Sequence, residues 1–296
     1  MRIVTWNCCR GKFAAKTEFL RELAPDVAIV QECARPAGES AGVCWAGSNP
    51  RQGVAVITAN GYAAEPLSID GGAEVPPWVV PFRVTGPESF TLLAVWALPH
   101  RGSYSRAVCL GIDALSNLFA AGPAVVAGDF NSNPVFDRKR RDWTYATIEA
   151  RLHAHGLASA YHAFHAEAPG HESRATYYHT WREDLAYHLD YCFVPRAWLP
   201  RITRVDVASY DAWKGRSDHR PVIVDLSSNG NGESWIATAS SSNQPRRDSP
   251  PHAPEVPGCV VAGRALAEVR ARMREALAFH IDGSRREGVP FPEPLA

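Results

Sequence analysis

Short apolar runs separated by polar, glycine and proline residues recur along most of the chain, and their length is that of ordinary β-strands. The predicted strands cover residues 2–6, 27–31, 54–58, 78–84, 90–97, 124–127, 175–181, 189–195, 202–207 and 222–226. Apolar residues at helical spacing predict helices over residues 16–24, 106–120 and 143–156. This pattern predicts one strand-rich α/β domain over residues 1–227.

The composition changes after Ser227. Residues 228–253 are dense in Ser, Asn, Gly and Pro, which is typical of a flexible linker. A new apolar pattern follows in residues 254–296, where a helical stripe comprises Leu266, Val269, Met273, Ala276 and Leu277. This small α+β appendage is too short to bury a core alone, so we expect it to dock, to associate or to be marginally stable.

Composition places the chain among ordinary globular proteins. The 296 residues are 46% hydrophobic and 21% charged, and Lys plus Arg equals Asp plus Glu at 31 each. No net field therefore draws the protein to nucleic acid or to an anionic membrane, and local groups would have to bind a polyanion. Seven cysteines without C-x-x-C spacing indicate neither a disulfide framework nor a structural zinc site. Without a leader or a long apolar run, we expect a cytoplasmic protein that does not insert into membranes.

Polar residues suited to chemistry stand where several predicted strands end. After the apolar run 124–127 come Asp129 and Asn131, whose side chains point the same way because side chains alternate along a strand. A turn would also explain this segment, since Asp, Asn, Ser and Pro initiate turns. Similar residues end or flank other strands: Asn7, Glu32, Asp190, Asp218 and His219. Their recurrence makes a turn alone the weaker interpretation.

The clustered acids predict a hard metal ion. If Glu32, Asp129 and Asp218 converge, two like charges about 4 Å apart repel by roughly 4 kcal/mol at an effective dielectric of 20. A cation or retained protons must relieve that repulsion, and oxygen ligands favour Mg²⁺ or Mn²⁺. Such an ion, two amides and a histidine beside an acid suit hydrolysis of a phosphate ester by an activated water.

Five ordered motifs resemble the endonuclease/exonuclease/phosphatase superfamily, the exonuclease III and DNase I-like phosphoesterases. They are IVTWNC (3–8), PDVAIVQEC (25–33), VVAGDFNSNP (125–134), HLDYCFVP (188–195) and GRSDHRPVIVDL (215–226). Together they span residues 1–226. The resemblance implies a four-layered α/β/β/α sandwich with the site along one edge of two packed sheets.

The resemblance also implies a role for each residue. Glu32 is similar to the main metal ligand, with Asn7 beside it and Asp218 supporting the metal side. Asp129 resembles the residue that positions the attacking water, and Asn131 resembles the donor to the scissile phosphate. His219 resembles the histidine that contacts the phosphate, with Asp190 orienting it.

Two segments depart from the family pattern. Nucleases of the family commonly carry Asn-x-Asp in the first motif, whereas here Cys9 follows Asn7 by two residues, which puts a two-metal scheme and abasic-site nuclease activity in doubt. In place of a Tyr-x-Pro-Asn segment, residues 95–106 offer His100, Tyr104 and Arg106 as substrate-binding candidates, with an ordinary loop as the alternative.

Histidines of the segment 161–165 are a weaker signal. His162 and His165 share one face of a predicted helix, where either a substrate-side role or simple hydrogen bonding would explain them.

Residues 254–296 resemble part of a HicB-type antitoxin domain, through PEVPGCVVAG (254–263), the helix 268–283 and REGVPFPEP (286–294). Its leading strands are missing or degraded, so we assign it no antitoxin activity and consider partner binding or self-association instead.

Three functions follow as hypotheses. The first is a Mg²⁺- or Mn²⁺-dependent phosphoesterase acting on a phosphodiester or phosphomonoester. The second is a DNA or RNA nuclease, including the repair type. The third, of another class, is a regulatory fusion that binds a partner through residues 254–296.

Overall fold

The computed structural model of the chain describes residues 1–38, 40–68, 78–137, 142–228, 235–238 and 260–263. The chain divides into two compact units, Met1–Ser227 and Ser228–Ala296. The first unit contains every residue that the sequence assigns to catalysis, metal binding or substrate binding.

One six-stranded sheet of the first unit has the order β13-β14-β1-β2-β4-β3. Its strands are β1 (Arg2–Asn7), β2 (Val27–Cys33), β3 (Val43–Asn49), β4 (Gln52–Thr58), β13 (Ile202–Val207) and β14 (Val222–Leu226). β1 and β2 are parallel, so Asn7 and Glu32 emerge at the same edge of the sheet. β14 is antiparallel to β1 and therefore begins at that edge, shortly after His219.

The second six-stranded sheet has the order β5-β6-β7-β8-β12-β9. Its strands are β5 (Ala63–Pro66), β6 (Val79–Thr85), β7 (Phe90–Trp96), β8 (Ala124–Asp129), β9 (Leu157–Ser159) and β12 (Asp190–Pro195). β8 is parallel to β7 and antiparallel to β12. The last residue of β8, Asp129, is therefore the direct pairing partner of the first residue of β12, Asp190.

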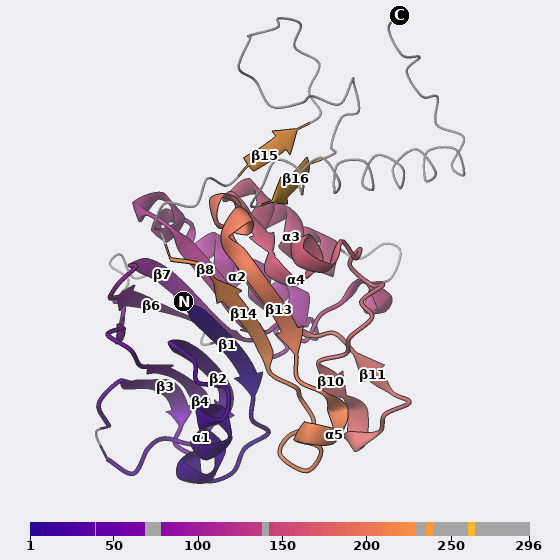
Figure 1. The fold of residues 1–296 in the computed structure, drawn as a ribbon. Helices are drawn as coiled ribbons and strands as arrows, with labels where there is room; N and C mark the ends of the chain where they lie inside the picture. The colour runs from indigo at the N-terminus through magenta and orange to yellow at the C-terminus, as the bar shows by residue number, and fades with distance from the viewer. Residues whose placement is uncertain (39, 69–77, 138–141, 229–234, 239–259, 264–296) are drawn as a thin grey trace, which may run out of the picture. The chain divides into compact units, whose positions relative to one another are not determined.

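The two sheets pack face to face over an apolar core (Figure 1). Ile3 and Ile29 from the first sheet and Leu92 and Val125 from the second belong to this core, and all four are buried. Val4, the neighbour of Ile3, belongs instead to the cluster on the outer face of its sheet, because successive side chains of a strand point to opposite faces.

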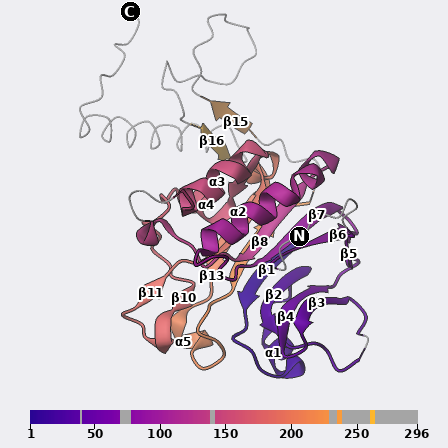
Figure 2. The ribbon, with the colours of Figure 1, turned by 180° about the vertical axis from the view of Figure 1, so that it is seen from behind.

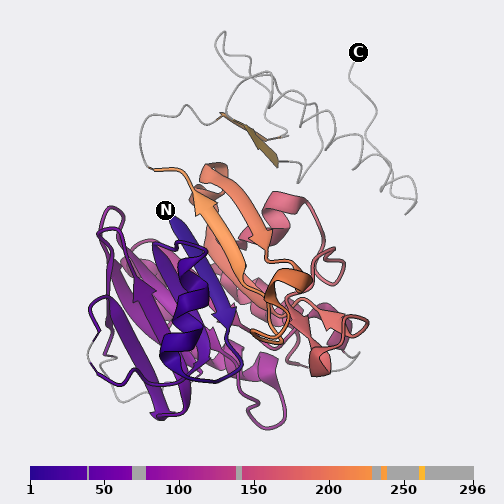
Figure 3. The same cartoon turned by 60° about the horizontal axis from the view of Figure 1, so that its bottom comes forward.

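Helices form the two outer layers. α1 (Phe13–Arg21) covers the outer face of the first sheet, where Leu20 joins the cluster of Val4 (Figure 3). α2 (Tyr104–Ala114) and α3 (Tyr145–Ala154) cover the outer face of the second sheet, where Val108 and Ile148 pack with Val126 (Figure 2). The predicted four-layered α/β/β/α sandwich is therefore confirmed.

Shorter elements complete the first unit. They are α4 (Ala160–His165), α5 (Tyr210–Trp213), the two-stranded sheet β10 (Tyr177–Tyr178) and β11 (Ala186–Tyr187), and the 3-10 turns η1 (Ser116–Ala121), η2 (Pro134–Phe136), η3 (His179–Trp181) and η4 (Arg196–Arg201).

Two predicted elements are shorter than the sequence pattern indicates. The apolar run 175–181 is a strand only at Tyr177–Tyr178, because Thr180 and Trp181 adopt left-handed backbone angles with φ of 52° and 64°. The helix predicted over 106–120 ends at Ala114 and continues as the separate turn η1. Apolar residues beyond Ala114 extended the pattern without extending the helix.

In the second unit the structure describes a pair of antiparallel strands, β15 (Trp235–Thr238) and β16 (Val260–Gly263). The helix 268–283, the segment 286–294 and most of the linker 228–253 lie outside the described residues. The HicB-like assignment of 254–296 and its partner-binding role therefore stay predictions. Within the described ranges, no helix has the length and hydropathy needed to cross a bilayer.

Candidate active site

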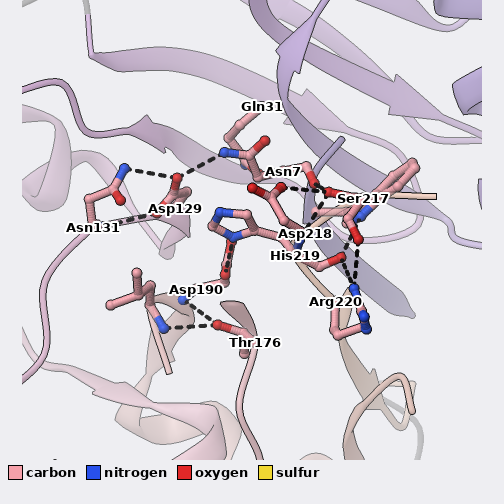
Figure 4. Close-up of polar contacts among 12 residues, drawn as sticks. Asn7, Gln31, Asp129, Asn131, Thr176, Asp190, Ser217, Asp218, His219 and Arg220 are labelled. Carbon is pink, nitrogen blue, oxygen red and sulfur yellow. Dashed lines mark hydrogen bonds and ion pairs between the residues drawn. The ribbon is translucent and has the colours of Figure 1, made fainter. Parts of the chain in front are cut away.

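The polar residues at the strand ends come together at one edge of the sandwich (Figure 4). Asn7 ends β1, Asp129 ends β8, Asp190 begins β12, and His219 precedes β14. The facing of the two sheets brings these four side chains, which are separated by up to 212 positions in the sequence, into contact.

Asn7 joins the two sheets. Its side-chain amide donates to Oε1 of Glu32 at 3.3 Å and to Oδ2 of Asp129 at 2.9 Å. Its side-chain oxygen Oδ1 accepts from the backbone N–H of Cys9 at 3.0 Å. The Asn7 side chain thus has a partner for each of its polar atoms and fixes the separation of the two acids.

Glu32 reaches this position through an irregularity in its strand. The register of β2 against β4 shifts between Val30 and Cys33, and Glu32 has a φ of 56°. A bulge of this kind redirects a side chain that a regular strand would aim elsewhere. The Glu32 side chain stays 23% exposed, unlike the fully buried Asp129.

The backbone before and after Asp129 is equally specific. A Cβ on Gly128, whose φ is 150°, would lie 1.9 Å from the carbonyl oxygen of Val95, so only glycine fits between these paired strands. Asn131 has a φ of 46°, and its backbone N–H and side-chain amide both donate to the Asp129 carboxylate, at 2.9 and 3.0 Å. Phe130 packs in the core between them, as the alternation in the sequence predicts.

A second partner occupies the Asn131 amide, which also donates to the carbonyl oxygen of Ala97 at 3.1 Å. Both amide hydrogens are therefore engaged within the protein. In this arrangement Asn131 holds Asp129, and donation to a phosphate would require one of these bonds to open.

Asp190 and His219 form a buried pair. Nδ1 of His219 lies 2.8 Å from Oδ2 of Asp190, and the two side chains are 5% and 0% exposed. Thr176 supports the acid by accepting from the backbone N–H groups of Leu189 and Asp190. Ser217 supports the histidine by accepting from its backbone N–H at 3.0 Å. Oδ1 of Asp190 is buried and has no hydrogen-bond partner among the described residues.

The three charged groups shift one another's protonation. Burial raises the pKa of Asp129 to about 7, and the charge of Asp190 adds to this rise, while His219 and the hydrogen bonds from Asn7 and Asn131 oppose it. Burial alone would lower the pKa of His219, but the charges of Asp190 and Asp129 and the hydrogen bond to Asp190 outweigh it and raise that pKa to about 9. The imidazole is therefore mostly protonated at neutral pH.

Asp218 stands beside this pair on the side of the first sheet. Ser217 donates to its carboxylate at 3.4 Å. The thiol of Cys9 is close enough that its pKa is raised to about 12, by burial, by the charge of Asp218 and a hydrogen bond to it, and by the charge of Glu32. Cys9 therefore carries no charge at neutral pH, and the first motif lacks a second acid in space as well as in sequence.

Two sets of residues could hold a cation. Asp129, Asp190 and His219 offer ligand atoms within 4.8 Å of one another. However, Nδ1 of His219 is occupied by Asp190, and a protonated imidazole cannot ligate a metal. Glu32, whose side chain is 23% exposed, offers a carboxylate and Asn7 an amide oxygen, with Asp218 nearby, and an oxygen-rich set fits a hard divalent ion.

The substrate-binding candidates lie near the start of α2. The His100 ring packs on Trp78 with centroids 5.4 Å apart, and Tyr104 is 40% exposed. The guanidinium of Arg106 lies over the ring of Trp143 at 5.4 Å. Among the described residues, no hydrogen bond or ion pair joins these three side chains to Asp129 or His219, so their role stays a prediction.

Tyr177, which contacts His219, and its neighbour His179 were not predicted from the sequence as functional residues. The ring of Tyr177 lies 4.6 Å from that of His219, and the Tyr177 hydroxyl is 2.8 Å from Nδ1 of His179. Both lie in a segment that the apolar pattern presented as an ordinary strand. The mixture of Tyr and His just before the Asp190 motif was the available signal.

Arg10 was also missed. Its Nε lies 3.5 Å from Oε2 of Glu32, next to the predicted metal ligand. The sequence showed Arg10 only as part of a polar loop after the first motif.

With this geometry established, comparison with known proteins places the chain. The sequence profile of the Endonuclease/Exonuclease/phosphatase family matches residues 4–219. The chain belongs to this family. Its members are hydrolases of phosphate esters, so the strand-end residues lie in the domain of a nuclease or phosphatase. No curated protein matches the chain.

Solved structures of the same fold agree in architecture. The 3' phosphatase NExo from Neisseria, bound to product DNA hairpin, has a TM-score of 0.55 and 18% identity over 77% of this chain and 99% of its own. The endonuclease domain of TRAS1, a telomere-specific non-LTR retrotransposon, has a TM-score of 0.56 and 15% identity over 77% of this chain and 99% of its own. An AP endonuclease from Archaeoglobus fulgidus has a TM-score of 0.55 and 15% identity over 76% of this chain and 99% of its own. At these identities the likeness shows the fold alone.

Proposed function

We propose that the protein is a metal-dependent phosphoesterase that cleaves a phosphate ester by attack of water. One observation carries this proposal: the amide of Asn7 holds the partly exposed Glu32 and the buried Asp129 together, beside the protonated His219 of the Asp190 pair. A site for a cation, a proton acceptor and a proton donor thereby lie at one edge of the sandwich.

Glu32 and Asn7, with Asp218 in support, would hold Mg²⁺ or Mn²⁺. Such an ion would polarise a phosphoryl oxygen and offset the negative charge that grows during cleavage. The fit rests on the donor atoms, since carboxylate and amide oxygens are the ligands that these hard ions prefer. Oδ1 of Asn7 accepts from the backbone N–H of Cys9, so it would bind the ion through its remaining lone pair.

Asp129 is the proposed proton acceptor for the attacking water. A general base works best with a pKa near the working pH, and the pKa of Asp129 is raised to about 7. Asn7 and Asn131 fix the orientation of its carboxylate through three hydrogen bonds. Asn131 acts here as a positioning residue.

His219 is the proposed donor to the phosphate. Asp190 occupies Nδ1, so the ring presents Nε2 to the substrate, and the raised pKa keeps that nitrogen protonated. A positive N–H aimed at the developing oxyanion stabilises the transition state more than the ground state. No covalent intermediate is needed.

A nucleic acid is the second candidate for the substrate class, and exposed aromatic rings favour it. Trp181 is 43% exposed and Phe136 is 47% exposed. Phe136 packs on Tyr187 at 4.8 Å, and Tyr187 pairs with Tyr177, which touches His219. Exposed rings beside a phosphate site can stack on bases. NExo, which shares the fold, was solved with a DNA hairpin product.

Hydrolysis of a small substrate panel tests the proposal. The panel comprises p-nitrophenyl phosphate, bis-p-nitrophenyl phosphate, single-stranded DNA and duplex DNA with an abasic site, each with Mg²⁺, Mn²⁺ or EDTA. We expect turnover that EDTA abolishes and that Asp129→Asn reduces about 1000-fold. Asp113→Asn, in the half-exposed ion pair with Arg151, is the matched control and should retain full activity. Equal rates with and without EDTA would refute metal dependence, and an active Asp129→Asn would refute the assigned base.

A further inference from the structure

Arg10 forms an ion pair at the edge of the proposed metal site, yet its side chain is 71% exposed. We propose that Arg10 is an anion clamp: its guanidinium leaves Glu32 when a divalent cation binds there and then contacts a non-bridging oxygen of the substrate phosphate. This inference rests on the proposed function, because it takes the bound anion to be a phosphate ester.

The backbone holds Arg10 at the site. Cys9, Arg10 and Gly11 have φ values of 51°, 63° and 104°, so three successive residues adopt left-handed angles. Left-handed angles are unfavourable for non-glycine residues and persist where surrounding contacts enforce them. Here the contact is the hydrogen bond from the Cys9 backbone to Asn7, the residue that also holds Glu32 and Asp129. The turn that carries Arg10 is therefore built on the site itself.

Arg10 is suited by charge to contact the substrate phosphate. Among the described residues, Arg10 is the sole Lys or Arg side chain in an ion pair with Glu32, Asp129, Asp190 or Asp218. His219 is already paired with Asp190. Cys9 stands where the family pattern has a second acid, and the next residue, Arg10, brings a guanidinium to Glu32.

Arg220 carries a guanidinium and follows His219 in the sequence, but it cannot perform this task. Its side chain is fully buried, and Nη1 donates to the backbone carbonyls of Ser217 and His219 at 2.7 and 3.2 Å. Its plane lies 4.5 Å from the ring centroid of Tyr178. Arg220 supports the loop that carries His219, whereas Arg10 has most of its surface in solvent.

The pair between Arg10 and Glu32 is suited to exchange. At 3.5 Å and with a largely exposed guanidinium, it belongs to the class of surface ion pairs that contribute little to stability. A divalent cation competes directly for Oε2 of Glu32, and a phosphate offers the planar fork of the arginine two oxygen acceptors. Both exchanges replace a weak contact with a stronger one.

Two binding measurements on the full-length protein test the clamp. In a Mn²⁺ titration followed by electron paramagnetic resonance, Arg10→Gln should bind Mn²⁺ about threefold more tightly than the unchanged protein, because Glu32 loses its competitor. With Mn²⁺ saturating, calorimetry should show that inorganic phosphate binds Arg10→Gln about tenfold more weakly. Arg10→Lys should lie between the two proteins in phosphate affinity, since it retains the charge without the fork.

Arg204→Ala is the matched control. Arg204 is exposed and paired with Asp206 on β13, away from the site, so its removal should change neither affinity. Thermal melts establish that each variant is folded.

An unchanged Mn²⁺ affinity in Arg10→Gln would overturn the competition for Glu32. An unchanged phosphate affinity would overturn the clamp and leave Arg10 as a surface ion pair that orders its loop. If both shifts occur while the substrate panel shows no turnover, the clamp stands and the proposed hydrolysis fails.

Discussion

Two buried imidazole–carboxylate pairs lie in the family domain, and they use their hydrogen-bonding atoms differently. In the pair of His219 and Asp190, Nδ1 is bonded at 2.8 Å, but Oδ1 of Asp190 has no partner among the described residues. In the pair of His162 and Glu172, the ring uses both nitrogens, Nδ1 with the hydroxyl of Ser159 at 2.7 Å and Nε2 with Glu172 at 3.0 Å.

The carboxylate of Glu172 is also fully occupied. It accepts from the backbone N–H of Gly170 and from the side-chain amide of Asn133, and the side chain is 4% exposed. Burial opposes ionisation, but the hydrogen bonds from His162 and Gly170 outweigh it and lower the pKa of Glu172 to about 2. Because both ring nitrogens of His162 are engaged within the protein, the imidazole has no free N–H to donate to a substrate.

The comparison therefore separates chemistry from structure. Both pairs join a buried imidazole to a buried carboxylate, but only the pair of His219 and Asp190 has the catalytic role proposed above, whereas we expect the pair of His162 and Glu172 to stabilise the fold. Breaking each pair in turn should affect different measured quantities.

Removal of the two histidines gives the largest contrast. We expect His219→Ala to lower kcat/KM about 1000-fold, because the donor to the developing oxyanion is lost. His162→Ala should lower the melting temperature while activity per folded molecule stays within about twofold of the unchanged protein. Steady-state kinetics with thermal melts check this, and comparable activity losses in the two variants would contradict the distinction.

Neutralisation of Asp190 is expected to have the next largest effect. Asp190→Asn should lower kcat about 100-fold, because the imidazole loses both its orientation and the charge that stabilises its protonated form. Since Asp190 helps to raise the pKa of His219, the alkaline limb of the pH–rate profile should also move to lower pH. A loss of rate with an unmoved alkaline limb would mean that Asp190 acts on structure alone.

The pH–rate profile of the unchanged protein should be bell-shaped. Asp129 must be deprotonated to accept a proton, so activity should rise through about pH 7, and His219 must be protonated to donate, so activity should fall through about pH 9. Each limb should approach a tenfold change per pH unit. A rate that is flat from pH 6 to 10 would rule out both assignments.

The smallest effect is expected at Glu172, the partner of His162. Glu172→Gln should lower the free energy of unfolding by about 2 kcal/mol and the melting temperature by about 4–8 °C, with little change in kcat. Because the pKa of Glu172 is lowered in the folded protein, its contribution is present above the unfolded value of about 4.3 and is lost as the pH falls toward 2. The two proteins should converge in stability at low pH, and a constant difference down to pH 2 would assign the effect to packing.

The sequence predicted the layers and the strand-end acids because both depend on local pattern. Asp129 and Asn131 follow a buried strand, and the parallel pair β1 and β2 carries Asn7 and Glu32 to one edge. Their meeting follows from topology once the sheets are known to face each other. The site residues that the sequence did not predict are placed by backbone angles and by contacts between distant parts of the chain.

Tyr177 and Arg10 illustrate this limit. Tyr177 reaches His219 through an isolated bridge between residues 42 positions apart, which no local pattern encodes. Arg10 turns toward Glu32 through left-handed angles at non-glycine residues, which the sequence gives no reason to expect. The role of His162 was ambiguous in the sequence, because its hydrogen-bond partner Glu172 lies outside α4, the helix that contains His162.

The family domain joins its own ends at the side of the sheet away from the site. The Met1 ammonium donates to the carbonyl oxygen of Leu226 at 2.7 Å, and the backbone N–H of Leu226 donates to Met1 at 2.8 Å. A short peptide could therefore link residue 226 to residue 1, and the chain could be reopened at the exposed turn of Asn60 and Gly61. The domain is thus suited to circular permutation and to insertion into a host protein as a catalytic cassette.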